Sequence, residues 1–556
     1  MPEYTLVLLE VTGIQDYVFN SNHLVQNIGA SELVEVVTEE WLVNALEDEF
    51  LRINVTWDKT DGLRCTPGES LPDSNLDAEV VYRGGGVAMI LFNNKERAKN
   101  FLKRLTRRVI EEAPGLQLVT IHDHVDWEKE SLAYKHKKLR QRLSARKLDR
   151  PFSAPLAGLG VTAQCVFTGM PTVGWDDDPR LVGTDAAVCK KDLGEPLKRI
   201  SAEVAQKIKK ESRAQKRLVD LVPRVQEEGF KYAKSFNDFG EKGTSSYIAV
   251  IHADGNEMGK RFMEIVKSYD SPEKNSEYVK VLRAFSRSIQ DNACNALIKT
   301  IDYLLDHWEE YEKETGNSLI SRRNKKLLPF RPIVFGGDDV TFVCEGRLGL
   351  TLAEKYLEFY SKNKLSDGKL AYARAGVAVV KSHYPFSRAY ALADSLAGEA
   401  KKRIKNLIEL DEDTISVMDW HFSTTGIEAR LEEIRCREYT SVTGISLLMR
   451  PIRISDAKNK WRTWKTFSTL VSEFKHGKNW SGRRNKVKSL RDTLRQGKEG
   501  VELFLKNYGL DKLPEISKQQ DMALSGWQGD DCGYFDAIEA LDFMIIFDNN
   551  KKDEKS

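Results

Sequence analysis

Cysteine is scarce in this chain of 556 residues: the seven cysteines are scattered along it, and none forms a Cys-x-x-Cys pair. This odd, dispersed set excludes a disulfide framework and favours reduced thiols, as in a cytoplasmic protein. Long apolar runs are also missing, because the longest, at 5–9 and 543–547, fall far short of the roughly 20 residues of a membrane span. We therefore expect a cytoplasmic protein with no membrane partner.

A strong net charge is absent as well. The 85 Lys and Arg residues oppose 83 Asp and Glu residues, which leaves a formal charge of +2 and no global field that draws the chain onto nucleic acid. With 41% hydrophobic and 30% charged residues, the composition is that of an ordinary globular protein. The length predicts three or four domains of about 150 residues each.

The chain contains an internal repeat. The first copy has an apolar run, a helical pattern, a hairpin pattern, a second helical pattern and an apolar run, at 4–10, 27–47, 79–92, 94–112 and 116–122. The same order returns about 245–250 residues later, followed by a further helix, at 247–254, 283–312, 331–344, 354–363, 372–380 and 386–405. This order is typical of a ferredoxin-like antiparallel sheet with helices on one face.

The repeat predicts an α+β fold with two ferredoxin-like domains of the palm or nucleotide-cyclase type. We expect a first palm domain at 1–126 and a helical linker domain with a remnant zinc-knuckle-like loop at 127–240. A second palm domain is expected at 241–420 and an all-α carboxyl-terminal domain at 421–556.

Three carboxylates in the second copy are the candidate catalytic and metal-binding residues. Asp338 and Asp339 follow Gly336-Gly337 on a tight hairpin, and Asp254 ends the preceding apolar run. Because the first strand of a ferredoxin-like sheet lies beside the hairpin, the three acids should converge. Converging carboxylates repel unless cations join them, and oxygen ligands suit two Mg²⁺ or Mn²⁺ ions in a nucleotidyl transfer. A solvated Asp-rich turn is the alternative.

A glycine-punctuated turn after Asp254 is the candidate phosphate-binding site, because backbone N–H groups and a lysine there can face phosphate oxygens. The candidate nucleotide-binding residues are Gly255, Asn256, Gly259, Lys260, Gly336 and Gly337, with Lys401 on the last helix. For Asn256 a turn role, and for Lys401 a solvated helix position, remain alternatives.

The first copy lacks a metal site by alignment. Gly86 and Val87 stand where the second copy has Asp338 and Asp339, and Glu10 alone occupies the position of Asp254. We expect this copy to be either a structural partner or a platform for a second nucleotide. In the latter case Gly84, Gly85 and Gly86 approach the ligand; a plain hairpin turn is the alternative.

Five segments carry a family likeness: TGIQDYVF at 12–19, GASELV at 29–34, HADGNEMGK at 252–260, FGGDDVTFVC at 335–344 and AGVAVVKSHYPFSRAYALADSLAGEAKK at 375–402. Together they resemble the large subunit of type III CRISPR effector complexes, often called the CRISPR polymerase. The resemblance implies two palm domains, an intervening zinc-binding segment and a helical carboxyl-terminal domain. It also implies synthesis of cyclic oligoadenylate from ATP as a second messenger in antiviral defence, with Asp254, Asp338 and Asp339 as the metal-binding acids.

Two features depart from that family near the amino terminus. Many members begin with a metal-dependent HD nuclease domain, whereas this chain starts at the first palm strand, so we expect no such domain. The letters HD do occur in His122-Asp123-His124, which we interpret as a turn at the end of a strand.

Two further features concern the segments outside the palms. Cys165 and Cys189 offer two thiols where a structural zinc site needs four ligands, so we expect a knuckle that folds without metal. The basic segment 475–498 holds nine Lys or Arg residues around Trp480. It is either an RNA contact with a stacking aromatic or a solvated helix face.

We therefore expect a metal-dependent nucleotidyltransferase that converts ATP to cyclic oligoadenylate, with two Mg²⁺ or Mn²⁺ ions as cofactors. ATP is the expected substrate; guide RNA and effector subunits are candidate partners, and target RNA is a candidate activator. A polymerase that acts outside any guide-RNA complex is a further alternative. The alternatives are a non-catalytic scaffold subunit of an RNA-guided complex and a GGDEF-like dinucleotide cyclase.

Overall fold

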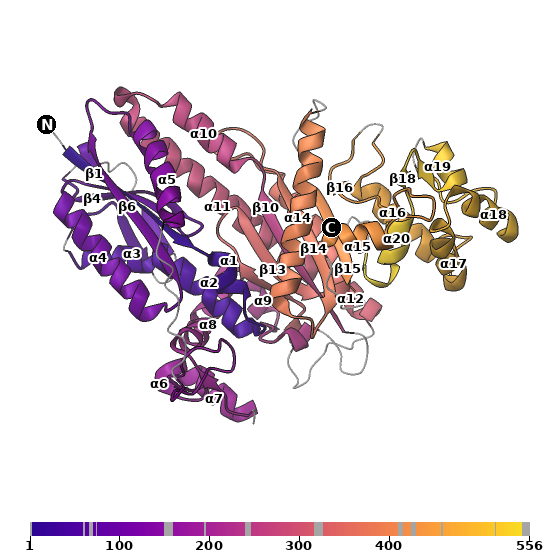
Figure 1. Ribbon diagram of the computed structural model, residues 1–556, viewed down its shortest axis with the longest axis horizontal. Coiled ribbons are helices and arrows are strands. Elements are labelled where there is room, and N and C mark those ends of the chain that lie inside the picture. The colour runs from indigo at the N-terminus through magenta and orange to yellow at the C-terminus, as the bar shows by residue number, and fades with distance from the viewer. Residues whose placement is uncertain are drawn as a thin grey trace.

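Two β-sheets, one in each half of the chain, organise the structure (Figure 1). In this computed structural model the described residues are 3–49, 51–58, 62–65, 71–73, 75–149, 160–193, 196–239, 246–315, 326–409, 415–423, 430–457, 460–516 and 519–547. Among the helices so described, none is long and apolar enough to cross a membrane.

The first sheet is four-stranded and antiparallel, in the order β4-β5-β1-β6. This is the ferredoxin-like order that the sequence repeat predicts. Its part of the chain comprises β1 (Glu3–Thr12), α1 (Ile14–Phe19), α2 (Leu24–Thr38), α3 (Glu40–Glu47), β2 (Val55–Asp58), β3 (Gly62–Cys65), β4 (Ala78–Gly84), β5 (Val87–Phe92), α4 (Lys95–Glu112) and β6 (Gln117–Asp126).

Strand β6 is longer than its apolar run predicts. His122 lies opposite Val7 and His124 opposite Thr5, so the His-Asp-His sequence lies inside the strand. The interpretation of these residues as a turn is wrong. The strand continues through these residues because β1 has backbone hydrogen-bonding groups along its whole length, and β6 pairs with all of β1.

The segment between the sheets is mainly helical, as predicted. It comprises α5 (Leu132–Leu148), β7 (Gly174–Trp175), α6 (Pro179–Val182), α7 (Thr184–Leu193), β8 (Arg199–Ile200), α8 (Ala202–Leu221), α9 (Arg224–Glu227) and β9 (Phe230–Tyr232). This segment contacts the first half through α8 and the second half through β9. In Figure 1, α6 and α7 lie below α8, at the edge of the molecule. Helix α8 packs on α2, where Arg217 Nε donates to the buried Glu32 Oε2 at 2.9 Å.

Cys165 lies in a small apolar cluster with Val182, Ile200 and Val204. Its thiol belongs to no group of three or more potential metal ligands among the described residues. The side chain of Cys189 lies outside the described residues, so the metal-free knuckle stays a prediction.

The second sheet has six strands in the order β12-β13-β10-β14-β15-β16, whose first four repeat the ferredoxin-like order. Its elements are β10 (Tyr247–Gly255), α10 (Met258–Ser268), α11 (Asn275–Asp306), α12 (Trp308–Thr315), β12 (Phe330–Val334), β13 (Asp339–Glu345), α13 (Gly349–Tyr360), β14 (Ala373–Lys381), α14 (Phe386–Glu409) and β15 (Val417–Ser423). A short strand, β11 (Lys326–Leu328), pairs with β9.

Helices cover both faces of the second sheet, and the expectation of helices on one face is wrong here. Gly349 of α13 packs against Ala249 of β10, whereas Gly376 of β14 packs against the Ala393 carbonyl of α14. The extra cover arises because α14 is the crossover between β14 and the parallel strand β15 (Figure 1). Ala249 and Asp254 point to opposite faces, since strand side chains alternate.

Helix α11 joins the two sheets. Arg283 Nη2 donates to Glu79 Oε1 of β4 at 2.6 Å, and Ser286 Oγ donates to the Arg83 carbonyl at 2.8 Å. The two palm-like halves therefore contact each other directly, close to both hairpin turns.

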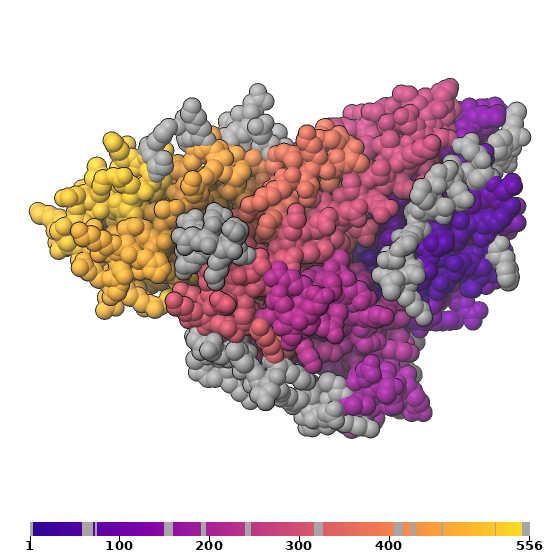
Figure 2. Space-filling model, turned by 180° about the vertical axis from the view of Figure 1, so that it is seen from behind, coloured from indigo at the N-terminus to yellow at the C-terminus, as the bar shows by residue number. Residues whose placement is uncertain are grey.

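The carboxyl-terminal part is mostly helical and forms one end of the molecule, with the amino-terminal residues at the other end (Figure 2). It comprises α15 (Leu431–Glu438), β16 (Ile452–Arg453), α16 (Trp464–His476), α17 (Arg484–Leu494), α18 (Lys498–Tyr508), α19 (Gln520–Ser525), β17 (Trp527–Gln528), β18 (Asp531–Cys532) and α20 (Phe535–Glu539). The buried Arg450 joins it to the second sheet, with ion pairs to Asp419 of β15 and Asp536 of α20.

Trp480 is not available to stack on a nucleic-acid base. Its side chain is 3% exposed and packs between Phe474 and Phe504, with ring centroids at 5.0 and 6.5 Å. The hypothesis of Trp480 as a stacking aromatic is wrong, because its indole is needed to fill the core of this helical part.

Candidate metal and nucleotide site

Strand register brings the three candidate acids together. On β10, Asp254 lies directly opposite Asp339, the first residue of β13, and Asp338 precedes it in the turn. One carboxylate oxygen from each of the three lies within 4.8 Å of the others. Oxygen ligands at this spacing fit Mg²⁺ or Mn²⁺, and among the described residues this is the only such group.

The electrostatics of the group are those of crowded carboxylates. Burial and the charge of Asp339 raise the pKa of Asp338 from 3.8 to about 6. Loss of solvation and the charge of Asp394 raise the pKa of Asp339 to about 6. Both pKa shifts mean that too little positive charge lies near the two carboxylates to stabilise their ionised forms. A bound divalent cation would supply that charge.

One positive side chain does face the group. Arg374 of β14 lies opposite Asp254 in the register and forms an ion pair with it. Its Nη1 also donates to Asn256 Oδ1 at 3.3 Å. Arg374 was not a candidate from the sequence, because only the pairing of β14 with β10 places it beside Asp254. Its one local signal is a lone arginine at the start of an apolar strand.

A histidine and a fourth carboxylate extend the group on the face covered by α14. His252 Nε2 lies 3.6 Å from Asp394 Oδ1, and its Nδ1 lies 3.2 Å from Thr341 Oγ1. Burial lowers the pKa of His252 to about 4, so it is neutral at pH 7. Neither residue was a sequence candidate, because their proximity depends on the packing of α14 on the sheet.

The glycine turn of the site contacts the first half of the chain. Gly336 has φ +114°, a conformation that favours glycine, and a side chain at Gly337 would lie 3.6 Å from Gly85 Cα. The guanidinium of Arg217 stacks 4.3 Å from the ring centroid of Phe335, just before the turn. The structure thus brings the predicted turns 84–86 and 336–337 against each other.

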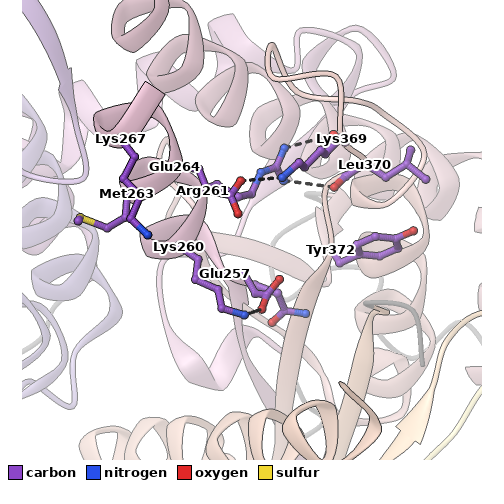
Figure 3. Close-up of a pocket in the computed structure, with 10 residues that line it drawn as sticks. Glu257, Lys260, Arg261, Met263, Glu264, Lys267, Lys369, Leu370 and Tyr372 are labelled. Atoms are coloured by element: carbon purple, nitrogen blue, oxygen red, sulfur yellow. Dashed lines mark hydrogen bonds and ion pairs between the residues drawn. The ribbon is translucent and has the colours of Figure 1, made fainter. Parts of the chain in front are cut away.

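The residues after Asp254 line a hollow of about 520 Å³ (Figure 3). Asn256 and Lys260 are on its wall, and Figure 3 shows Tyr372 across from Lys260. Asn256 is 5% exposed and donates to the Ile415 carbonyl at 3.2 Å, so it also fixes the turn. Lys260 is exposed and pairs with Glu257 Oε1 at 2.6 Å.

Three predicted phosphate contacts differ in their surroundings. Gly259 faces open space, at the start of α10. Lys401 is exposed on α14, seven residues beyond Asp394. Gly255 is enclosed: a side chain there would lie 3.2 Å from Asp338 Cβ, so the turn and the strand end approach closely.

The first half repeats this geometry without the two acids of the hairpin turn. Glu10 of β1 lies opposite Val87 of β5, as Asp254 lies opposite Asp339. Glu10 forms an ion pair with Lys147. The register therefore agrees with the alignment made from the sequence repeat.

Residues 247–409 match the family model described as Cas10/Cmr2, second palm domain. Among proteins with curated descriptions, none matches the chain in sequence.

The chain is similar to several solved structures, of which three follow. A Csm1-Csm4 cassette in complex with AMPPNP is 14% identical, with 97% of this chain and 69% of that chain covered and a TM-score of 0.50. A Csm1-Csm4 cassette in complex with pppApA is 13% identical, with the same coverage and a TM-score of 0.49. Csm1 in T. onnurineus is 15% identical, with 97% and 70% covered and a TM-score of 0.49.

The fold and the acid-bearing hairpin define a palm-type domain. Residues 247–409 match the Cas10/Cmr2 second palm domain, and this match confirms the resemblance to the large subunit of type III CRISPR effector complexes. The α+β class with two palm-like sheets and a helical carboxyl-terminal part is likewise confirmed.

Proposed function

We propose that the chain is a metal-dependent nucleotidyltransferase that joins ATP molecules into cyclic oligoadenylate, as a subunit of a type III CRISPR effector. The observation that carries this proposal is the strand register that brings Asp254, Asp338 and Asp339 within 4.8 Å beside a Gly-Gly turn. The match to the Cas10/Cmr2 second palm domain supports it.

The residues have separate roles in this proposal. Asp254, Asp338 and Asp339 hold one or two divalent cations, which when bound neutralise the triphosphate and polarise the reacting oxygens. The turn before α10 and Lys260 contact phosphate oxygens. A ribose hydroxyl of one nucleotide then attacks the α-phosphorus of the next, and pyrophosphate leaves.

The solved structure with the same fold supports the choice of ligand and partner. That structure is a Csm1-Csm4 cassette in complex with AMPPNP. We therefore propose ATP as the substrate and effector subunits as the partners, with guide RNA and target RNA as further members of the active assembly.

The test is product analysis by mass spectrometry. Purified protein is incubated with each of the four nucleoside triphosphates separately, with Mg²⁺ or Mn²⁺. We expect cyclic adenylates from ATP that are lost in the Asp338→Ala/Asp339→Ala double variant. Asp530→Ala, an exposed aspartate on the turn of another hairpin, is the matched control and should keep activity.

The alternatives give different products. A linear or cyclic dinucleotide alone favours a GGDEF-like cyclase. No product, even with co-purified subunits, guide RNA and target RNA, favours a scaffold whose acids are vestigial. The ion pair of Arg374 with Asp254 is the observation that favours this second reading, because a protein cation already neutralises one ligand.

A further inference from the structure

A tyrosine beneath the acidic group has no assigned role. Tyr360 is the last residue of α13, its side chain is 0% exposed, and its hydroxyl has no hydrogen-bond partner. A buried hydroxyl without a partner is costly, and such groups call for an explanation. Tyr356, one turn earlier, has the same property.

The hydroxyl of Tyr360 points toward the acid-bearing turn. A Cβ built on Gly255 would lie 3.0 Å from the Tyr360 hydroxyl oxygen and 3.2 Å from Asp338 Cβ. The absent side chain of Gly255 therefore leaves a space that the hydroxyl and the base of Asp338 border together. Asp338 is also the charged group that acts most strongly on the Tyr360 hydroxyl.

Arg261, the positively charged group that acts on Tyr360, already has hydrogen-bond partners. Arg261 donates to Asp367 Oδ2 at 2.7 Å and to the carbonyls of Leu370 and Lys369, both at 3.2 Å. All of these acceptors belong to the loop before β14, and Figure 3 shows the bonds to Lys369 and Leu370. Arg261 carries no acceptor, so it cannot receive a hydrogen bond from the hydroxyl.

We propose that Tyr360 is a positioning residue: its hydroxyl donates a hydrogen bond to the carboxylate of Asp338 when that carboxylate binds a divalent cation. This inference rests on the proposed function of Asp338 as a metal ligand. Ligand carboxylates are held by hydrogen bonds from the surrounding residues, and loss of such a bond weakens metal binding by about 10–100-fold. Burial of the unpartnered hydroxyl destabilises the metal-free protein, and the new hydrogen bond offsets this loss of stability when metal binds.

The test is the affinity of the full chain for Mn²⁺ alone, measured by isothermal titration calorimetry. Tyr360→Phe should weaken Mn²⁺ binding about 10-fold or more, without lowering the melting temperature of the metal-free protein. Tyr232→Phe is the matched control, because Tyr232 is also buried with an unpartnered hydroxyl, but on β9, outside the palm sheets. It should leave Mn²⁺ binding unchanged.

Two results would overturn the inference, and they are distinguishable. If Asp338→Ala/Asp339→Ala abolishes Mn²⁺ binding but Tyr360→Phe binds like the native chain, the positioning role fails and the proposed metal site stands. If the double variant itself binds Mn²⁺ like the native chain, the metal site fails, and the role of Tyr360 fails with it.

Discussion

Replacing Asp338 by Asn should stabilise the metal-free protein at neutral pH, although it removes a group that we propose as a ligand. Asp338 ionises beside Asp339 in partly buried surroundings, and these raise its pKa from 3.8 to about 6. A folded-state pKa above the unfolded value means that ionisation costs stability. The penalty begins as pH rises above 3.8 and is complete above about 6.

The magnitude follows from the shift. A pKa raised from 3.8 to about 6 corresponds to about 3 kcal/mol at 1.36 kcal/mol per pH unit. Because Asp338 is only half-buried, solvent screening reduces this to about 1–2 kcal/mol. With about 2–4 °C per kcal/mol, the melting temperature should rise by about 2–8 °C.

The assay is thermal unfolding in a chelator at pH 7.5 and pH 4.5, with the exposed Asp530→Asn as the matched control. Asp338→Asn should unfold at a higher temperature than the native chain at pH 7.5, and the gain should be much smaller at pH 4.5. With excess Mn²⁺ the order should reverse, since only the native chain gains binding energy. If Asp338→Asn unfolds at a lower temperature than the native chain at pH 7.5, or gains equally in melting temperature at both pH values, repulsion between the carboxylates does not destabilise the metal-free protein.

Three further predictions follow from the same contacts. Arg374→Gln should strengthen Mn²⁺ binding several-fold in calorimetry, because Arg374 competes for Asp254; weaker binding would contradict this. Mn²⁺ affinity should fall as pH drops through about 6, where both turn carboxylates take up protons, and a flat profile between pH 5 and 7 would argue against them as ligands. Trp480→Ala should destabilise the carboxyl-terminal helices by about 3–5 kcal/mol in chemical unfolding; an unchanged stability would contradict its role in the core.

The repeated strand order could be predicted because its signals are local. Apolar runs of strand length, glycine hairpins and helical spacing occur in the same order twice, and the sheets follow that order. The position of Asp254 at a strand end and of Asp338 and Asp339 after two glycines is also visible in the sequence. Convergence of these acids then follows from the fold.

The rest of the site depends on long-range packing. Arg374 is placed by strand register, Asp394 by the packing of α14 and Tyr360 by the end of α13 under the turn. No local pattern marks Asp394 or Tyr360, and the lone arginine at the start of an apolar strand is the only local signal of Arg374. The same limit explains why the prediction for Trp480 was wrong. Its basic neighbours are visible in the sequence, whereas its aromatic partners lie on other helices.

The most direct test of the central claim is anomalous diffraction from crystals of the full chain grown with Mn²⁺ and AMPPNP. We expect an anomalous peak within about 2.5 Å of carboxylate oxygens from Asp254, Asp338 and Asp339, with Arg374 displaced from Asp254. This peak should vanish in crystals of the Asp338→Ala/Asp339→Ala variant. No peak between these carboxylates, with nucleotide bound and Arg374 still paired with Asp254, would contradict the claim that this palm is a metal-dependent nucleotidyltransferase.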